Sequence, residues 1–344
     1  DRWLNRVPGG LVLSNLGACA IFSALSGSSP ATCAAIGKMG IPAMVERGYP
    51  KAVAAGSIAA GGTLGILIPP SVVMVIYGYL TETDVGQLFI AGIIPGIIIG
   101  IALMLVCYIT ARKRNYKTMT DRPRFSEVSK AFKDSFWALL VPIIILGGIY
   151  GGIFTPTEAA VVAVVYSVII GKFVYRELDM KSLYDCLKST GLINGATSFL
   201  IGLSMAFASY LAMAQIPAKM AAWLTAFVDS PFLLLMIINV FLLIIGCFVD
   251  NIAAVIILTP ILLPVVKMIG IDPIHFGLII TVNLACGFIS PPYGINLFVA
   301  SAISGESIES ISREIIPAFV AMVGCLLLFT YFPIFTMGLL QLMR

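Results

Sequence analysis

Residues 85–111 form a run of 27 residues without a single charged side chain. As an α-helix this run is about 40 Å long, which exceeds the roughly 30 Å hydrocarbon core of a bilayer. Over all 344 residues, 59% are hydrophobic and only 11% are charged. Soluble domains carry about 25% charged residues, so the sequence predicts an all-α polytopic membrane protein and excludes a soluble enzyme. An outer-membrane β-barrel is excluded as well, because its strands alternate in polarity.

Basic residues gather in two stretches that lie between apolar runs. Residues 112–134 hold eight of the 21 Lys and Arg, and residues 172–188 hold four more. Two apolar runs separate the stretches, so both fall on one side of the membrane, and the positive-inside rule places that side in the cytoplasm. Residues 305–314 fit this topology less well, because they carry three acids and one base on the same side. The sequence contains no nucleic-acid-binding motif, so we expect no nucleic-acid partner.

At a fixed offset of 222 residues, the chain matches itself at six Pro and Gly positions without a gap. The clearest match pairs GILIPP at 65–70 with GFISPP at 287–292. The matched pairs are Pro42 and Pro264, Gly48 and Gly270, Gly65 and Gly287, Pro69 and Pro291, Pro70 and Pro292, and Pro95 and Pro317. We interpret the two halves as a duplicated unit.

Each unit begins with an apolar hairpin that has a polar tip. It continues with a helix that the GxxxPP motif interrupts, and it ends with another helix. The first unit covers 1–111, with a hairpin at about 10–45, a broken helix at about 52–80 and a helix at 85–111. The second covers 231–344, with a hairpin at about 231–266, a broken helix at about 274–303 and a helix at 315–342. Residues 112–230 form the basic loop and linking helices.

The hairpin arms are marginal in length for a full crossing, so we expect both hairpins to be re-entrant. The charges at their ends place them on opposite faces of the membrane. Inverted-topology repeats with paired broken helices are typical of secondary transporters.

The breaks offer oxygen ligands, because proline removes a backbone donor and disrupts the helix. Freed carbonyls near 65–70 and 287–292 indicate a cation, and polar side chains at the hairpin tips would complete its ligands. These tip residues are Ser26, Ser28, Ser29, Asp250 and Asn251. The N-termini of the half-helices favour an anionic substrate.

Asp250 is an acid within an apolar hairpin, where a charge is costly, and this favours a functional role. Its alternative role is a helix cap for the backbone of Ala253 and Ala254. Glu158 fits a capping box with Thr155 better than a site.

Two further kinds of polar residue stand out in the apolar runs. We expect His275, the only histidine, to lie at the membrane interface. Asn239 and Asn283, as well as Asn296, are candidates for hydrogen bonds between helices.

Four sequence motifs resemble those of the large membrane subunit of tripartite ATP-independent periplasmic (TRAP) transporters. They are SGSSPAT at 26–32, GILIPPS at 65–71, GIYGGIFTPTEAA at 148–160 and SPPYGIN at 290–296. The resemblance implies a bacterial inner-membrane importer that uses sodium, Na+, and an elevator motion to take up an organic acid such as a C4-dicarboxylate or a sialic acid. It also implies a small four-helix membrane subunit, separate or fused, and a periplasmic substrate-binding protein. The early helices expected before the first hairpin are missing from this sequence.

The resemblance also implies two sodium sites and a substrate site. One sodium would lie between Ser26, Ser28 and Ser29 and the carbonyls of Gly65, Ile68 and Pro70. A second would lie between Gly246, Asp250 and Asn251 and the residues Gly287, Ser290 and Pro292. The residues expected to contact the substrate are Ser29, Thr32, Ser71, Tyr293 and Asn296.

Three other functions remain as alternatives to a TRAP transporter subunit. A stand-alone divalent-anion/sodium symporter would share the inverted hairpins but need no binding protein. A membrane-embedded enzyme would require a nucleophile–base pair within the membrane, and the sequence offers none. A channel is disfavoured, because two blind hairpins suit alternating access better than a continuous pore.

Overall fold

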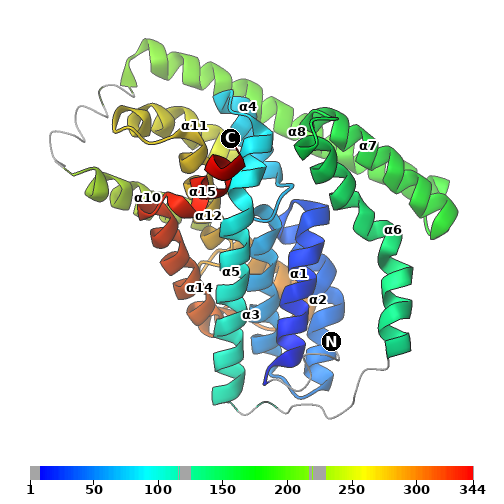
Figure 1. Cartoon of the computed structure of the whole chain (residues 1–344). Helices are drawn as coiled ribbons and strands as arrows, with labels where there is room; N and C mark the ends of the chain where they lie inside the picture. The colour runs from blue at the N-terminus through cyan, green and yellow to red at the C-terminus, as the bar shows by residue number, and fades with distance from the viewer. Residues whose placement is uncertain (1–7, 115, 117–124, 217–218, 220–229, 344) are drawn as a thin grey trace. The chain divides into compact units, whose positions relative to one another are not determined.

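A computed structural model describes residues 8–114, 116, 125–216, 219 and 230–343. Every regular element in these ranges is a helix, which confirms the prediction of an all-α protein (Figure 1). The chain divides into two compact units, one of residues 1–122 and 215–344 and the other of residues 123–214. Part of the expected basic loop, with Lys117, Arg122 and Arg124, lies outside the described residues.

Six helices in the described ranges are long and apolar enough to cross a membrane. They are Val85–Lys113, Pro156–Val174, Met180–Leu211, Pro231–Phe248, Asn251–Met268 and Ile308–Tyr331. Two of them are the arms of the second hairpin, and at 18 residues each they are only about 27 Å long. Their length alone does not separate a crossing from a re-entrant arm.

The first part of the larger unit follows the order hairpin, broken helix, helix. Its elements are α1 (Gly10–Ser26), α2 (Ser29–Glu46), α3 (Lys51–Gly62), the 3-10 turn η1 (Thr63–Ile66), α4 (Val72–Thr81) and α5 (Val85–Lys113). The hairpin turns at Gly27, whose φ of 60° is a left-handed conformation that glycine adopts at little cost. The broken helix stops after η1, where Pro69 and Pro70 lack the N–H groups that an α-helix needs.

The second part of this unit has the same order of elements. They are α10 (Pro231–Phe248), α11 (Asn251–Met268), α12 (Pro273–Gly287), α13 (Ile295–Ser304), α14 (Ile308–Tyr331) and α15 (Ile334–Met343). The break between α12 and α13 contains Pro291 and Pro292. The peptide bonds Pro69–Pro70 and Pro291–Pro292 are both cis.

The single helix expected at 315–342 is two helices. The first of them already begins at Ile308, and it ends at Tyr331. Phe332 has a non-helical φ of −124° and ψ of 83°, because the proline that follows disfavours the helical conformation. Pro333 therefore separates α14 from α15.

The two parts of the larger unit are interlocked. The second arm of the first hairpin, α2, packs against α3 of its own series and against α13 of the other. In the same way, the second arm of the second hairpin, α11, packs against α4. Helices α1, α2 and α3 lie side by side, and α1 also contacts α5 (Figure 1). Each hairpin thus contacts the second half of the broken helix from the opposite part of the chain.

The smaller unit contains α6 (Phe125–Tyr150), α7 (Pro156–Ile169), the π-helical turn η2 (Ile170–Val174) and α8 (Met180–Met213). Helix α7 begins with the expected capping box. The Thr155 hydroxyl accepts from the Glu158 N–H at 3.3 Å, and Glu158 Oε2 accepts from the Thr155 N–H at 2.9 Å. This geometry confirms the capping role of Glu158.

Candidate functional site

The tip of the first hairpin touches the first break through backbone atoms. The N–H of Val72 donates to the Gly27 carbonyl at 3.3 Å, and Gly27 also approaches the carbonyl of Pro70. A Cβ placed on Gly65 would lie 2.6 Å from the Ser28 carbonyl carbon and 2.8 Å from the Thr32 hydroxyl. Only glycine fits at position 65, and the absence of its side chain lets the hairpin tip approach the break.

Hydroxyl and carbonyl oxygens gather at this tip. Ser26 Oγ lies 2.8 Å from Thr32 Oγ1, and Thr32 Oγ1 donates to the Ser28 carbonyl at 2.9 Å. The N–H of Ser28 points to Ser26 Oγ at 3.3 Å. Of the residues expected at the first sodium site, Ser26, Ser28 and Gly65 are therefore neighbours, and Ile68 and Pro70 are half-buried. Thr32, which was expected to contact the substrate, also lies at this tip.

Ser29 and Asn296 form a direct link between the two parts of the larger unit. The Asn296 side chain donates from Nδ2 to Ser29 Oγ at 2.9 Å and to the Ala59 carbonyl at 2.8 Å. Both Ser29 and Asn296 are 0% exposed. Asn296 thus joins α13 to the first hairpin and to α3, which fits its expected role as a bridge between helices.

The second hairpin approaches the second break in a related way. Gly287 packs directly on the backbone of Gly246, and a Cβ on Gly246 would lie 3.3 Å from the Gly287 Cα. One residue further along the hairpin, Cys247 Sγ donates to Ser290 Oγ at 3.0 Å. Three of the residues expected at the second sodium site, Gly246, Gly287 and Ser290, therefore lie together.

Asn251 stands at the start of α11 and is 2% exposed. Neither its Oδ1 nor its Nδ2 has a hydrogen-bond partner among the described residues. A buried amide without partners costs about 1–3 kcal/mol, which makes Asn251 a candidate ligand for the second expected ion.

Asp250 precedes Asn251 and is exposed. Its Oδ2 accepts from the Ile252 N–H at 2.9 Å, while its backbone carbonyl accepts from Ala254 at 2.8 Å. The capping role is confirmed, although its side chain caps Ile252 rather than Ala253 or Ala254. A cap leaves oxygen lone pairs free, so this role does not exclude ion binding.

The remaining expected residues lie in differing environments. Ser71 is buried and caps α4 by accepting from the Met74 N–H at 3.5 Å. Pro292 and Tyr293 are exposed, and the Tyr293 ring lies 5.4 Å from that of Phe248. Tyr293 is thus the one expected substrate contact of the set that is more than half exposed, at 53%.

His275 is 2% exposed within the protein and lies in the first turn of α12, and its position at the membrane interface stays a prediction. Its Nδ1 lies 2.7 Å from the Thr336 hydroxyl, so α15 covers it. The burial follows from the split at Pro333, which turns α15 back onto α12.

The expected asparagine bridge is confirmed and extends further. Asn283 Nδ2 donates to Asn239 Oδ1 at 2.6 Å, and Asn239 Nδ2 donates to Thr330 Oγ1 at 3.0 Å. These bonds join α12, α10 and α14. Thr330, Gly27, Ala59 and Cys247 are contributors that the sequence did not single out. The glycine between two serines at a polar tip could have indicated Gly27, whereas a threonine in an apolar run carries no such signal.

Helices that break beside polar hairpin tips, within a polytopic membrane protein, define the architecture of secondary transporters. The chain belongs to the family "Tripartite ATP-independent periplasmic transporter, DctM component", which it matches over residues 3–335. This family consists of transporter permeases, so the membrane-enzyme alternative is set aside.

Several curated relatives carry transporter names. The chain is 45% identical over 333 residues to the isethionate TRAP transporter permease protein DctMQ of Oleidesulfovibrio alaskensis, and it covers 52% of that protein. It is 45% identical over 336 residues to the C4-dicarboxylate TRAP transporter large permease protein DctM of Pseudomonas aeruginosa, of which it covers 78%. It is 38% identical to the sialic acid TRAP transporter permease protein SiaT of Haemophilus influenzae and covers 53% of it. The chain thus spans about half the length of two of these relatives.

The fold resembles that of a solved transporter. The YdaH transporter of Alcanivorax borkumensis, whose crystal structure has an unusual topology, superposes with a TM-score of 0.62. The match covers 95% of this chain and 83% of that one at 16% identity, so it supports the fold alone.

Proposed function

We propose that this chain is the translocating subunit of a sodium-coupled importer of organic acids that receives its substrate from a periplasmic binding protein. The observation that carries the proposal is the close backbone approach of both hairpin tips to helix breaks, at Gly65 with Ser28 and at Gly287 with Gly246. Such paired sites near half-helix ends are where secondary transporters bind ions and substrate.

The chemistry of the first tip suits a hard monovalent cation. Ser26, Thr32 and the Ser28 carbonyl bring three oxygens together, and none of these groups carries a positive charge. Hydroxyl and carbonyl oxygens can replace the hydration shell of such an ion without a full negative charge. A bound sodium ion would then replace the hydrogen bond between Ser26 and Thr32. In the absence of sodium, this hydrogen bond holds the tip together.

The second tip offers a different set of ligands. The Asn251 amide is buried without a partner in the described part of the chain. Gly246, five residues earlier in the hairpin, lies against the backbone of Gly287. We assign a second sodium to this tip, with the Asn251 carbonyl oxygen and the carboxylate of Asp250 as candidate ligands.

The N-termini of α4 and α13 suit an acidic substrate. Each follows a break, at Ser71 and at Gly294, and each therefore directs the positive end of its helix dipole toward the break. Relatives are named for C4-dicarboxylates and sialic acid, which are acids. We propose an organic acid of this type as the substrate, with Tyr293 at the exposed side of the site.

An elevator motion fits the interlocked packing. Because α2 packs on α13 and α11 packs on α4, and because Asn296 bonds to Ser29, the two hairpins and the half-helices form one body. We propose that this body carries ion and substrate across a bacterial inner membrane while other helices stay fixed. A small four-helix membrane subunit, separate or fused, would join the fixed part.

Reconstitution tests this proposal. The chain, purified with its small membrane subunit, is placed in proteoliposomes with an inward sodium gradient, and uptake of labelled C4-dicarboxylate or sialic acid is measured with and without the binding protein. We expect accumulation above the outside concentration only with both sodium and the binding protein.

Each other outcome decides between the alternatives. Uptake without the binding protein would establish the stand-alone symporter. Equilibration without accumulation would establish a channel. Equal accumulation when potassium replaces sodium would refute the sodium coupling.

A further inference from the structure

A groove lies on the larger unit where the C-terminal end of α5 meets α14. It is lined by Val106, Ile109, Thr110, Lys113, Arg114 and Pro317, and it encloses about 320 Å³. Its lining is apolar toward the middle of α5 and basic at the end of the helix. A groove of this kind matches a molecule with an apolar tail and an anionic head.

The apolar part continues as a stripe along α5. Ile97, Ile101, Leu105 and Ile109 follow one another at four-residue spacing, so each lies next to the preceding one and together they form a stripe that winds slowly around α5. All four are about half exposed, between 49% and 55%. Lys113 is the next residue in this spacing, so the stripe ends in an ammonium group at the helix terminus. Within a membrane, an acyl chain can contact this stripe along its length, and the stripe ends at the ammonium group of Lys113.

The end of α5 carries an excess of positive charge. Arg112, Lys113 and Arg114 are consecutive and exposed. The acid that faces them from α14 is Glu314, whose Oε2 lies 2.8 Å from Arg114 Nη2. Hydrogen bonds to Glu314 and to Tyr116 raise the pKa of Arg114 above its ordinary value, so it stays charged.

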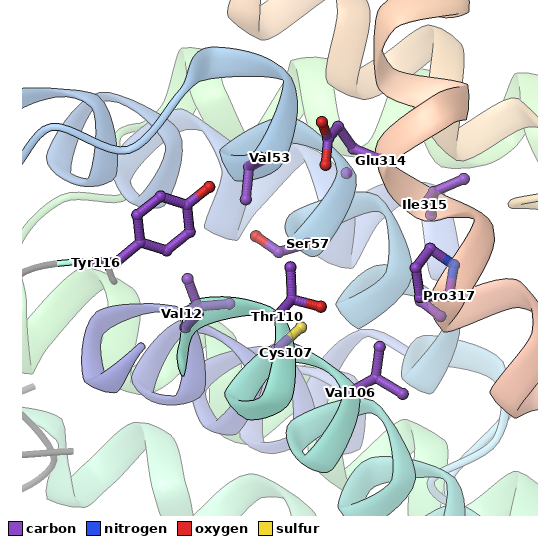
Figure 2. Close-up of a pocket in the computed structure, with 13 residues that line it drawn as sticks. Val12, Val53, Ser57, Val106, Cys107, Thr110, Tyr116, Glu314, Ile315 and Pro317 are labelled. Carbon is purple, nitrogen blue, oxygen red and sulfur yellow. The ribbon is translucent and has the colours of Figure 1, made fainter. Parts of the chain in front are cut away.

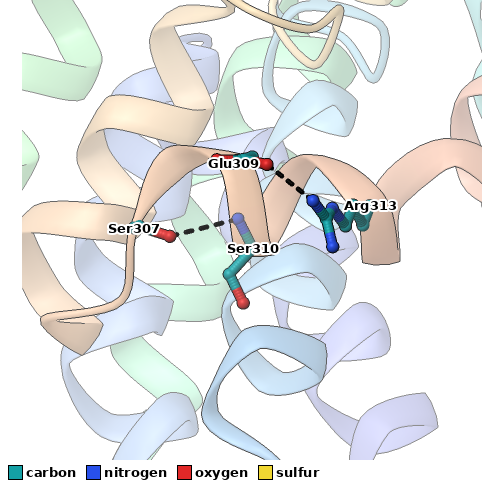
Figure 3. A network of polar contacts seen from close by, with 4 residues as sticks. All are labelled: Ser307, Glu309, Ser310 and Arg313. Atoms are coloured by element: carbon teal, nitrogen blue, oxygen red, sulfur yellow. Dashed lines mark hydrogen bonds and ion pairs between the residues drawn. The ribbon is translucent and has the colours of Figure 1, made fainter.

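The other charges at the start of α14 neutralise each other. Glu309 and Arg313 form an ion pair of 2.6 Å, next to the cap that the Ser307 hydroxyl provides by accepting from the Ser310 N–H (Figure 3). Glu314 and Glu309 are two of the three acids that weakened the expected topology, and both are now paired with bases. Among the residues that the structure describes, the three bases at the end of α5 therefore have one acid in an ion pair with them, Glu314.

The Arg114–Glu314 ion pair joins the lining of the groove, which includes Arg114, to the lining of a second space, which includes Glu314. This second space is a smaller cavity of about 40 Å³ whose lining includes Ser57, Tyr116 and Glu314 (Figure 2). Val106, Thr110 and Pro317 line both spaces, so they form the wall between them. A head group at Lys113 would thus meet a fixed wall and remain at the surface.

We propose that this groove binds an anionic phospholipid, with its phosphate at Lys113 and Arg114 and an acyl chain along Ile109 and Leu105. The Thr110 hydroxyl stands between the two parts and is placed to donate to a phosphate or ester oxygen. Basic residues at the end of a membrane helix attract anionic lipids with about 1 kcal/mol for each base. Loss of one base should therefore weaken binding about fivefold.

Lipid titration followed by native mass spectrometry tests the proposal. The chain is purified in detergent with its small membrane subunit and titrated with phosphatidylglycerol or phosphatidylcholine that carry identical acyl chains. We expect phosphatidylglycerol to bind more tightly, and K113Q to weaken this binding about fivefold. R112Q is the matched control, because Arg112 is an adjacent exposed base that does not line the groove. V106W fills the groove and should reduce the binding of both lipids.

Three results would overturn the proposal. Equal losses in K113Q and R112Q would indicate general surface charge and not a site. Displacement of the lipid by millimolar inorganic phosphate would indicate a free-anion site. If V106W releases the small membrane subunit while lipid binding is unchanged, a protein helix occupies the groove. Thermal unfolding of each variant shows that loss of binding does not come from loss of the fold.

Discussion

Asn296 donates a hydrogen bond of 2.9 Å to Ser29, which lies 267 residues earlier in the chain. A residue just after the second helix break is thereby bound to the tip of the first hairpin. The same amide also satisfies the Ala59 carbonyl in the first broken helix. This one side chain connects three segments that each take part in the proposed ion sites.

Replacing Asn296 by alanine should destabilise the protein. The change leaves the Ala59 carbonyl and the Ser29 hydroxyl buried without this donor, which costs about 1–3 kcal/mol. Thermal unfolding of the purified protein in detergent measures the loss. Y293A is the control, because Tyr293 is 53% exposed, and its midpoint should stay near that of the wild type. Equal midpoints for N296A and the wild type would contradict the structural role of the link.

Gly65→Ala should impair both stability and sodium-dependent uptake. The new methyl group would lie 2.6 Å from the Ser28 carbonyl carbon, so either the tip or the break must shift. Overpacking of this kind costs about 1–3 kcal/mol. Gly324→Ala is the matched control, since nothing lies within 4 Å of its Cβ position on α14. If G65A transports as G324A does, the close approach has no part in transport.

Asp250→Asn separates the two roles of Asp250. Asparagine is as good a helix cap as aspartate, so the stability of the hairpin should be retained. Loss of the carboxylate charge should raise the sodium concentration for half-maximal uptake about tenfold, which corresponds to about 1.4 kcal/mol. Asp250→Ala should show this shift and, in addition, a lower unfolding temperature. Unchanged sodium activation in D250N would remove the carboxylate from the ion site.

Glu158→Ala should affect stability without affecting sodium dependence. It removes the acceptor of the Thr155 N–H in the capping box, which is worth about 1 kcal/mol. Glu158→Gln is the control, because glutamine can also accept this bond. Unfolding midpoints and sodium titrations of uptake are both measured. If the sodium dependence of uptake changes in E158A and not in E158Q, this cap affects the transport cycle.

Proline and glycine made the helix breaks predictable from the sequence. Pro69, Pro70, Pro291 and Pro292 lack backbone donors, and as adjacent pairs they interrupt the helices, whereas the single prolines Pro42, Pro95 and Pro317 lie inside helices. The prediction of a single helix at 315–342 is wrong for the same physical reason, because the chain leaves the helical conformation at Phe332, before Pro333.

Contacts between distant segments were not predictable from one sequence. The bond of Asn296 to Ser29 depends on the packing of α13 against α2, which no local pattern encodes. The helix start at His275 is predictable from the neighbouring proline, whereas the cover that α15 gives to this side chain depends on tertiary packing. The exposure of Asp250 likewise depends on how far its hairpin tip extends from the neighbouring helices.

The packing of α2 on α13 has a consequence for biosynthesis. A ribosome makes the first hairpin long before it makes α13, which begins at Ile295. Until then, the hydroxyl of Ser29 and the carbonyl of Ala59 lack the amide that binds them in the finished protein. The first hairpin therefore stays incompletely packed in the membrane while the 237 residues from Ala59 to Asn296 are made. A truncated chain that ends before Asn296 is expected to be a substrate for membrane quality control.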